Sequence, residues 1–231
     1  MSFNLTEAKE IALEISSDQH DELGLAHAFA CVCNYLYDYP DRFSWRSPSN
    51  QPSVETTSGL KILAEKYFQS YRRSDFPATP TTKPDDMVSI VLAEAFGHSE
   101  TTINRIKIEH QQAMSAENCI GALLERYIDS VLRPYGWYWC CGSFTKAVDF
   151  VGRDHDGNWI ALQIKNRDNS ENSSSSAIRG GTRIQKWFRS YSRRNETNWH
   201  NIPSLMQGYQ LSEQGFQAYV RAYLHNERSS R

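Results

Sequence analysis

Three residues in the second half of the chain have the types and spacing needed for metal-dependent chemistry. Asp149 lies in one apolar run, 144–152, and Gln163 and Lys165 lie in a second, 158–165. The turn sequence Asp-His-Asp-Gly-Asn separates the runs and predicts a β-hairpin. Residues two apart on a strand share a face, so Gln163 and Lys165 lie together, and antiparallel pairing brings Asp149 close to both.

This grouping suits the hydrolysis of a phosphodiester. Such hydrolysis needs oxygen ligands for a divalent ion, and a cation near the attacking water or the developing negative charge. Asp149 and Gln163 offer the oxygens, and Lys165 offers the cation. Two structural alternatives stay open: Asp149 as an acid at a strand end or turn, and Lys165 as a charge on an edge strand.

The same residues resemble the PD-(D/E)xK nuclease superfamily, in which an acid on one strand and an acid-x-Lys pattern on the next surround magnesium. The following stretch is similar to the SinI group of type II restriction endonucleases: it reads KNRDNSENSSSSAIR at 165–179, then Gly181-Thr182 and Lys186-Trp187-Phe188. The resemblance is good over 115–203 and looser elsewhere. It implies an α/β fold with a Mg²⁺ cofactor: a restriction-endonuclease-like core, in which helices flank a central mixed β-sheet, plus an N-terminal helical region.

Gln163 departs from the superfamily pattern, which has Asp or Glu at that position. An amide oxygen binds magnesium without adding charge, so a second carboxylate is expected. The superfamily often supplies one from a Gly-x-x-x-Glu helix ahead of the first strand, which here is Gly121 to Glu125 within an apolar helical pattern at 116–132. Glu125 is the first choice and Glu117, two turns earlier, the reserve; alternatively, Glu125 is a solvated partner of Arg126.

The formal net charge of −2 conceals a strong asymmetry along the chain. Between residues 165 and 194, eight cationic residues face two acidic ones, a local net charge of +6, so the rest of the chain carries −8. A basic segment beside the candidate active site suits a polyanion, because cation–phosphate contacts release condensed counterions. The alternative is one solvated helix face rich in cations.

The basic segment divides into two parts. From Asn166 to Ser176 there is no hydrophobic residue, and the short polar side chains suit either a flexible loop or contact with base edges. Composition alone favours the loop, whereas the family resemblance favours recognition. From Ile178 the pattern predicts a helix whose aromatic residues Trp187, Phe188 and Tyr191 belong to the core.

The candidate DNA-binding residues are all polar or charged: Asn166, Arg167, Asp168, Asn169, Ser170, Glu171, Asn172, Arg179, Arg183, Lys186, Arg193 and Arg194. Arg167 and Arg179 are candidates for bidentate contact with guanine, and Asp168 or Glu171 for accepting from cytosine N4. Arg193 and Arg194 are expected to contact phosphates.

Ahead of residue 115 the chain has a mainly helical pattern. Apolar periodicity predicts helices at 6–15, 23–37, 59–72, 85–96 and 99–114, with proline-containing loops at 38–58 and 74–86. No internal repeat and no long polar linker interrupts the chain. Two regions are expected: 1–114, mainly helical and packed on the core, and 115–231, the nuclease core with its DNA-recognition segment.

Composition excludes several protein classes. A hydrophobic content of 39% with 12% aromatic residues excludes wholesale disorder. No apolar run approaches the roughly 20 residues of a membrane span, and no basic-then-apolar leader begins the chain, so a cytoplasmic protein is expected. The five cysteines and seven histidines lack metal-binding spacing. They indicate reduced thiols and give no support to zinc or to a histidine-based triad.

Together, the residues and the resemblance predict a type II restriction endonuclease that cleaves double-stranded DNA with Mg²⁺. The resemblance implies the target GGWCC (W is A or T), cut after the first G. A near-palindromic site indicates a two-fold symmetric homodimer, and a companion DNA methyltransferase would protect the same site. Two rivals stay open: a DNA-binding protein of this fold without cleavage, which Gln163 suggests, and a structure-specific repair or recombination nuclease.

Overall fold

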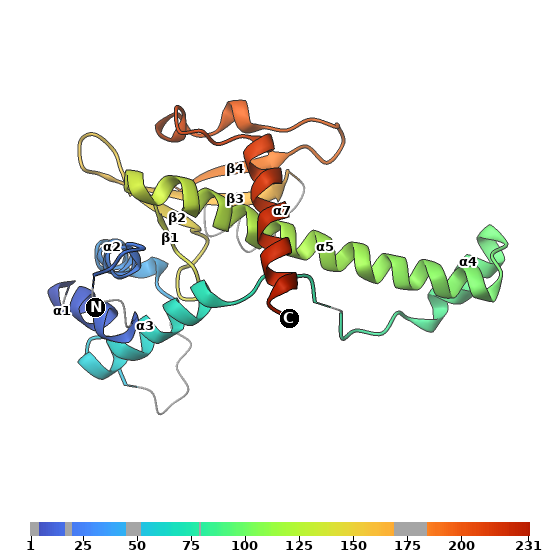
Figure 1. The fold of residues 1–231 in the computed structure, drawn as a ribbon, viewed down its shortest axis with the longest axis horizontal. Helices are drawn as coiled ribbons and strands as arrows, with labels where there is room; N and C mark the ends of the chain where they lie inside the picture. Colours follow the sequence, from blue (N-terminus) through green and yellow to red (C-terminus); the bar gives the residue numbers. More distant parts are fainter. Residues whose placement is uncertain (1–4, 17–19, 45–51, 79, 169–183) are drawn as a thin grey trace.

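The computed structural model describes residues 5–16, 20–44, 52–78, 80–168 and 184–231 (Figure 1). The helices are α1 (Leu5–Ser16), α2 (Leu25–Asp38), α3 (Thr57–Arg72), α4 (Asp86–Phe96), α5 (Glu100–Leu132) and α7 (Glu213–Ser229). The strands are β1 (Tyr138–Trp139), β2 (Phe150–Arg153), β3 (Trp159–Arg167) and β4 (Ile184–Ser190). Short 3₁₀ turns occupy Pro40–Arg42, Arg133–Tyr135, Trp199–Asn201 and Ser204–Met206.

The four strands form one mixed sheet in the order β1-β2-β3-β4. β1 pairs with β2 and β2 with β3 in the antiparallel sense, whereas β3 and β4 are parallel. The predicted α/β class, with a mixed sheet flanked by helices, is therefore confirmed. None of the helices in the described ranges is both long and apolar enough to cross a lipid bilayer.

The predicted hairpin is confirmed as β2 and β3. In its turn, the carboxylate of Asp154 accepts from the N–H groups of Asp156 and Asn158, and Gly157 takes the left-handed conformation with φ 81°. The first strand is shorter than predicted, because it starts at Phe150 and not at residue 144. Ala147 has φ 58°, a left-handed conformation that a strand cannot contain, so the preceding residues are irregular, although Phe144 is buried.

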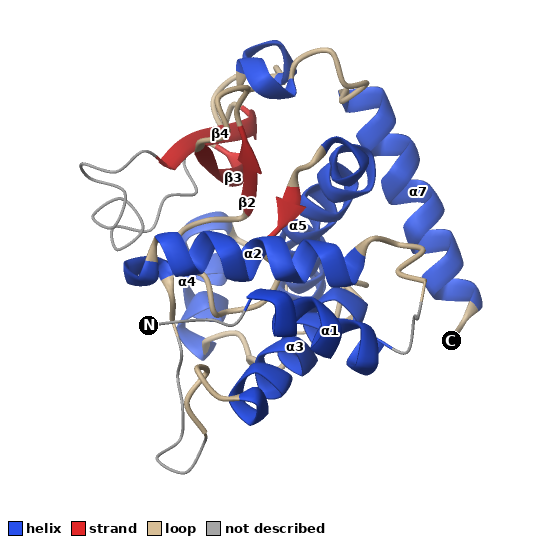
Figure 2. Ribbon diagram, turned by 90° about the vertical axis from the view of Figure 1, so that its left-hand side faces the viewer, coloured by secondary structure: helices blue, strands red, loops and turns tan. Residues whose placement is uncertain are grey.

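Helices cover the sheet from two sides. The second half of α5 buries an apolar stripe, Leu123, Leu124, Tyr127, Ile128 and Leu132, and α7 packs on it through ring contacts of Phe216 and Tyr219 with Tyr127. Figure 2 shows α5 and α7 on the same side of the strands. α1, α2 and α3 pack together, and α2 contacts β1. Trp159 of β3 donates its indole N–H to Asp38, at the end of α2, over 2.7 Å.

Three predicted elements need correction. The separate helices predicted at 99–114 and 116–132 are one helix, α5, because no glycine or proline interrupts the junction; α5 therefore crosses the predicted regional boundary at 114–115. Residues 184–190 are not helical but form β4, whose backbone bonds to β3. Trp187 is buried there, so its predicted place in the core is confirmed. α7 has no counterpart among the predicted helices.

Candidate active site

Asp149 is fixed against β3 by both its main chain and its side chain. Its N–H donates to the carbonyl of Leu162 (2.8 Å), and its carboxylate accepts from the N–H of Ile164 (2.6 Å). These two β3 residues flank Gln163. The structure therefore brings Asp149 beside Gln163, where β2 pairing begins, as the antiparallel arrangement predicts.

Gln163 and Lys165 lie on β3, the inner strand between β2 and β4. Gln163 is 2% exposed, and its side-chain Oε1 has no hydrogen-bond partner among the described residues. A buried oxygen without a donor costs about 1–3 kcal/mol, so this atom is well placed for a ligand. Lys165 is partly exposed, and its charge favours ionisation of both Asp149 and Glu125. It does not lie on an edge strand.

Glu125 projects from α5 toward the same site. The indole N–H of Trp139, on β1, donates to its carboxylate over 2.8 Å. Burial and the nearby charge of Asp149 raise the pKa of Glu125, and Lys165 and Trp139 oppose that shift. Burial also raises the pKa of Asp149, against the effects of the Ile164 N–H and Lys165. The two acids are thus close enough to resist simultaneous ionisation.

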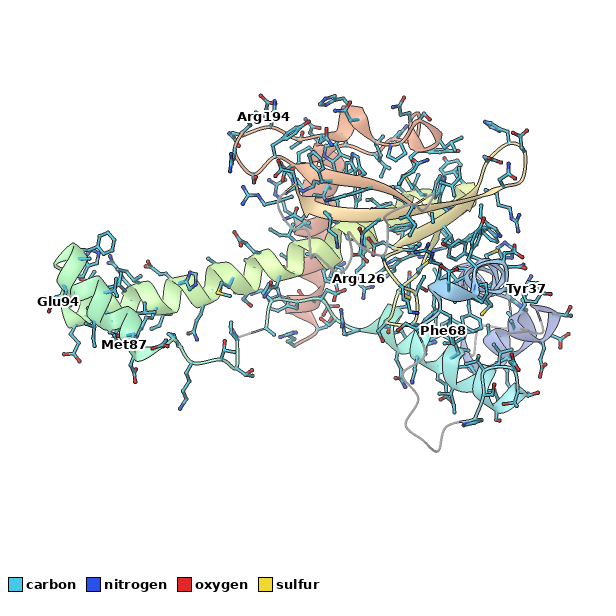
Figure 3. The ribbon with its side chains drawn as sticks, turned by 180° about the vertical axis from the view of Figure 1, so that it is seen from behind. Tyr37, Phe68, Met87, Glu94, Arg126 and Arg194 are labelled. Atoms are coloured by element: carbon cyan, nitrogen blue, oxygen red, sulfur yellow. The ribbon has the colours of Figure 1, made fainter. Side chains whose placement is uncertain are left out.

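Arg126 does not pair with Glu125. Its guanidinium donates to the Asp75 carboxylate (2.5 Å) and to the carbonyl of Tyr71 (2.8 Å), and its side chain is 10% exposed. The guanidinium also lies 5.3 Å from the Trp139 ring centroid. Figure 3 places Arg126 near the middle of the molecule, between the sheet and α3. Arg126 therefore anchors the loop after α3, which leaves Glu125 to the site.

Two of the cavities along the second half of α5 contain the acids that matter here. We name the first the acidic cavity: about 510 Å³, lined by Ser70, Arg73, Asp75, Gly121, Ala122, Glu125, Trp139, Cys140, Cys141, Gly142, Ser143, Thr145, Val148 and Asp149. The second, the arginine cavity, is about 640 Å³ and is lined by Glu117, Asn118, Ile120, Asn166, Arg167, Arg189, Ser190, Tyr191, Arg194, Asn195, Glu196, Thr197, Glu213 and Gln217. Glu125 shares a cavity with Asp149, whereas Glu117 faces the other one.

Three donor atoms fit a hard divalent cation such as Mg²⁺: Glu125 and Asp149 line the acidic cavity, and Gln163 lies on β3 beside Asp149 without lining it. Two carboxylates and one amide oxygen are all oxygen ligands, and the amide Oε1 of Gln163 is buried without a donor. The described residues contain no group of three His, Cys, Asp or Glu side chains that could hold a metal ion. The candidate metal site differs from such a group because its third oxygen belongs to a glutamine; its members are Asp149, Glu125 and Gln163.

Half of the predicted DNA-binding residues can be located. Asn166, Arg167, Asp168, Lys186, Arg193 and Arg194 are described, whereas Asn169, Ser170, Glu171, Asn172, Arg179 and Arg183 lie outside the described residues. Arg167 and Arg194 both line the arginine cavity, at the carboxyl end of β3. Arg194 also pairs with Glu196 (3.4 Å) and lies over the Tyr191 ring; Figure 3 shows it at the outer edge of the molecule.

Other predicted contacts serve the chain itself. The Asp168 carboxylate accepts from the N–H of Ser192 (2.8 Å), and the Asn166 side chain accepts from Arg189 (2.9 Å). Lys186 of β4 lies opposite Gln163 in the parallel register. These contacts fix the geometry around the end of β3.

Two residues beside these cavities carry no signal in the sequence. Trp139 is 6% exposed and holds the Glu125 carboxylate, yet it lies in an aromatic run that reads simply as core. The same is true of Glu213, which accepts from Arg189 (2.7 Å) and Trp199 (2.8 Å) across the arginine cavity. Both pairings join different elements of the fold, so local sequence patterns do not predict them.

Comparisons with known proteins extend the resemblance over nearly the whole chain. The family model described as SinI restriction endonuclease matches residues 8–226. The type II restriction enzyme Eco47I of Escherichia coli is 43% identical over 217 residues, which cover 92% of this chain and 94% of that protein. The type II restriction enzyme SinI of Salmonella infantis is 41% identical over 219 residues, covering 93% and 95%. The chain therefore belongs to the SinI family of type II restriction endonucleases, enzymes that cut DNA at specific sites.

Proposed function

We propose that this restriction endonuclease hydrolyses double-stranded DNA at GGWCC, after the first G, with Mg²⁺ held by Asp149, Glu125 and Gln163. The observation that carries the metal assignment is the buried, unpartnered Oε1 of Gln163 beside two carboxylates whose pKa values are raised. A bound divalent cation would supply Lewis acidity and offset the negative charge of both acids. The target sequence rests on the family resemblance alone.

The chain's own residues have separate tasks in this proposal. The Ile164 N–H holds the Asp149 carboxylate in one orientation, and the Trp139 indole does the same for Glu125. Lys165, whose charge acts on both acids, orients the attacking water or stabilises the negative charge that develops on the phosphate. Gln163 contributes an oxygen without a charge. Glu125 therefore supplies the second carboxylate, which the superfamily pattern has at the position of Gln163.

DNA recognition is assigned to the basic segment from Asn166 to Arg194. Arg167 lies at the end of β3, a short distance along the strand from Lys165, and it is exposed. The polar segment that continues from it is proposed to read base edges, and Arg193 and Arg194 to contact phosphates. This arrangement would join recognition directly to the strand that carries Gln163 and Lys165.

A near-palindromic target leads to a homodimer in which each subunit cuts one strand. Since such an enzyme also cuts unprotected host DNA, a companion methyltransferase that modifies the same site is proposed as a partner in the cell. Cytoplasmic location follows from that role.

Plasmid cleavage tests the proposal. Purified protein with Mg²⁺ should cut a plasmid carrying two GGWCC sites into two discrete fragments whose sequenced ends lie after the first G. A matched plasmid without the site should stay intact. Discrete cutting elsewhere would reject the target, absence of cutting would favour a binding protein that lost cleavage, and nicking that follows DNA structure would favour a repair nuclease.

A second readout separates metal binding from cleavage. Ca²⁺, an oxygen-seeking cation of the same charge, should raise the melting temperature of the free protein, because a ligand that binds only the folded state stabilises it. The double variant Asp149→Ala, Glu125→Ala should lose that shift. An unchanged shift in the double variant would move the metal away from the acidic cavity.

A further inference from the structure

α4 carries a broad apolar face that no described residue covers. α4 and the first half of α5 form a helical hairpin, 86–114, that projects from the body and is here named the arm (Figure 1, Figure 3). Eight of the eleven residues of α4 are apolar, yet none of them is buried. A helix that is apolar on most sides is normally buried, so α4 lacks the packing partner that its sequence calls for.

Helical spacing gathers four of the five exposed large apolar residues of α4 onto one face. At about 100° per residue, Met87, Val88, Ile90 and Val91 lie on the side away from Leu92 and Ala93, which are partly buried. Met87 is 59% exposed and Val91 53%. The only charge on that face is Glu94, whose position on the arm is visible in Figure 3. Of the eleven large apolar side chains that are exposed in the described residues, seven belong to the arm.

The arm is firmly built. Asp85 caps the start of α4 through the Met87 N–H (2.8 Å), and Gly97 ends the helix in the left-handed conformation, φ 67°. The Gln111 side chain donates to the carbonyl of Thr82 (2.9 Å), and the Ser115 hydroxyl donates to the carbonyl of Ala78. The segment leading into α4 is thus bonded to α5, so the apolar face is a fixed feature of the fold.

The size of the face matches a contact between two proteins. The four large apolar side chains of the α4 face, each about half exposed, leave roughly 300 Å² or more of apolar surface, comparable with the roughly 300–600 Å² of a monomer's largest patch. One partner in a stable interface contributes roughly 800 Å². A patch with a single charge also suits contact with an identical patch, because few like charges meet across the two-fold axis.

We propose that the arm is the dimer interface, with the apolar face of α4 packed against the arm of a second copy of this chain. The inference rests on the proposed function, which needs two copies at one near-palindromic site. It adds the surface through which they meet and the direction of the symmetry axis.

The axis direction follows from α5. This helix has 33 residues and is about 50 Å long, with the arm in its first half and Glu125 in its second. A two-fold axis perpendicular to α5 would hold the two bodies at opposite ends of the paired arms, too far apart to reach one short DNA site. A two-fold axis parallel to α5 places both bodies at the same end of the paired arms, where both acidic cavities can approach one DNA duplex.

Sedimentation velocity without DNA or metal tests the interface. The variant Ile90→Glu, Val91→Glu buries two charges if the arm pairs, so its dimer dissociation constant should rise about 100-fold or more. The matched control is Leu23→Glu, which changes a side chain that is 60% exposed on the body. Wild type and the control should sediment as dimers, and the arm variant as a monomer with an unchanged circular dichroism spectrum.

Hydrogen exchange gives a measurement that needs no variant. Amides of 86–96 in the wild type should exchange more slowly at high protein concentration than at low, whereas amides of α7 should not change. A wild-type monomer at tens of micromolar, an arm variant that remains a dimer, or concentration-independent exchange in 86–96 would each overturn the inference. Plasmid cleavage separates the failures: a wild type that dimerises through the arm but does not cut refutes the proposed function alone, and one that cuts while its arm variant stays dimeric refutes the interface alone.

Discussion

The arginine cavity and the acidic cavity, both along α5, hold carboxylates in opposite electrostatic environments. In the arginine cavity, burial works against ionisation of Glu213, but hydrogen bonds from Trp199 and Arg189 outweigh it and lower its pKa. In the acidic cavity, burial raises the pKa of Glu125, and the neighbouring charge of Asp149 adds to that effect. The charge of Glu213 is therefore balanced by neighbouring side chains, whereas that of Glu125 is not.

This difference shows how a structural acid differs from the acids that are proposed to bind metal. Glu213 has an arginine at 2.7 Å, so its charge is balanced inside the fold. The charge of Lys165 acts on both Glu125 and Asp149 but does not offset their burial, and the nearby Gln163 adds an oxygen without adding charge. A site with more negative charge than its own cations balance is stabilised by an added cation. The neighbours of a carboxylate decide its role more than its depth does.

The largest expected effect is at the proposed catalytic site. Asp149→Ala and Lys165→Ala should each lower the cleavage rate about 1000-fold or more, because one removes a metal ligand and the other the cation near the reacting phosphate. Rates are measured on plasmid with Mg²⁺. Sequence-specific binding in Ca²⁺ should persist for both variants. A variant that cuts near the wild-type rate removes its residue from the proposed catalytic set.

The next effect compares the two cavities directly. Glu125→Ala should lower the cleavage rate about 100-fold, whereas Glu117→Ala, two turns earlier on α5 and facing the arginine cavity, should change it less than about 3-fold. Both variants alter one exposed or partly exposed helical glutamate, so each serves as the control of the other. The opposite order would assign the extra carboxylate to Glu117.

Substitutions at Gln163 test whether the proposed metal site needs an oxygen or a charge at that position. Gln163→Ala should reduce cleavage by about 10–100-fold, since the buried oxygen is lost, whereas Gln163→Glu should retain or raise activity because it restores a charged ligand. Single-turnover rates at saturating Mg²⁺ decide the matter. Wild-type rates in both variants would exclude Gln163 from the metal site.

A smaller effect concerns stability in the arginine cavity. Glu213→Ala should lower the free energy of unfolding by about 2 kcal/mol, because Arg189, with a side chain that is 15% exposed, loses its carboxylate partner. Glu196→Ala breaks the exposed pair with Arg194 and should cost less than about 0.5 kcal/mol. Urea unfolding of the metal-free protein measures both. In the same assay, Glu125→Gln should be neutral or stabilising, and a loss as large as that of Glu213→Ala would contradict the comparison.

The smallest effects concern DNA binding at the arginine cavity. Arg167→Ala should weaken binding to GGWCC about 10-fold more than binding to a scrambled duplex, if a guanine contact is lost. Arg194→Ala should weaken both alike and reduce the salt dependence. Titrations at several salt concentrations measure this. An equal loss on both duplexes for Arg167→Ala would make that residue a backbone contact.

The sequence by itself determined the hairpin and the grouping on it. The turn residues at 154–158 and the alternation along 158–165 act over short separations, so they predict that Asp149, Gln163 and Lys165 meet. The hydrogen bonds of Asp149 to Leu162 and Ile164 agree with that prediction. Most helices before the sheet were predictable for the same reason, since apolar periodicity is also a local pattern.

Only the tertiary structure decided which distant groups share a cavity. The pattern at 184–190 suits a helix, but β3 supplies a parallel partner whose backbone bonds make it β4. Glu125 and Glu117 look alike in sequence, and the packing of α5 on the sheet turns one toward Asp149 and the other toward Arg189. Trp139 reaches Glu125 because β1 lies beside that helix. Contacts between distant segments depend on how the elements pack, and packing is a property of the whole chain.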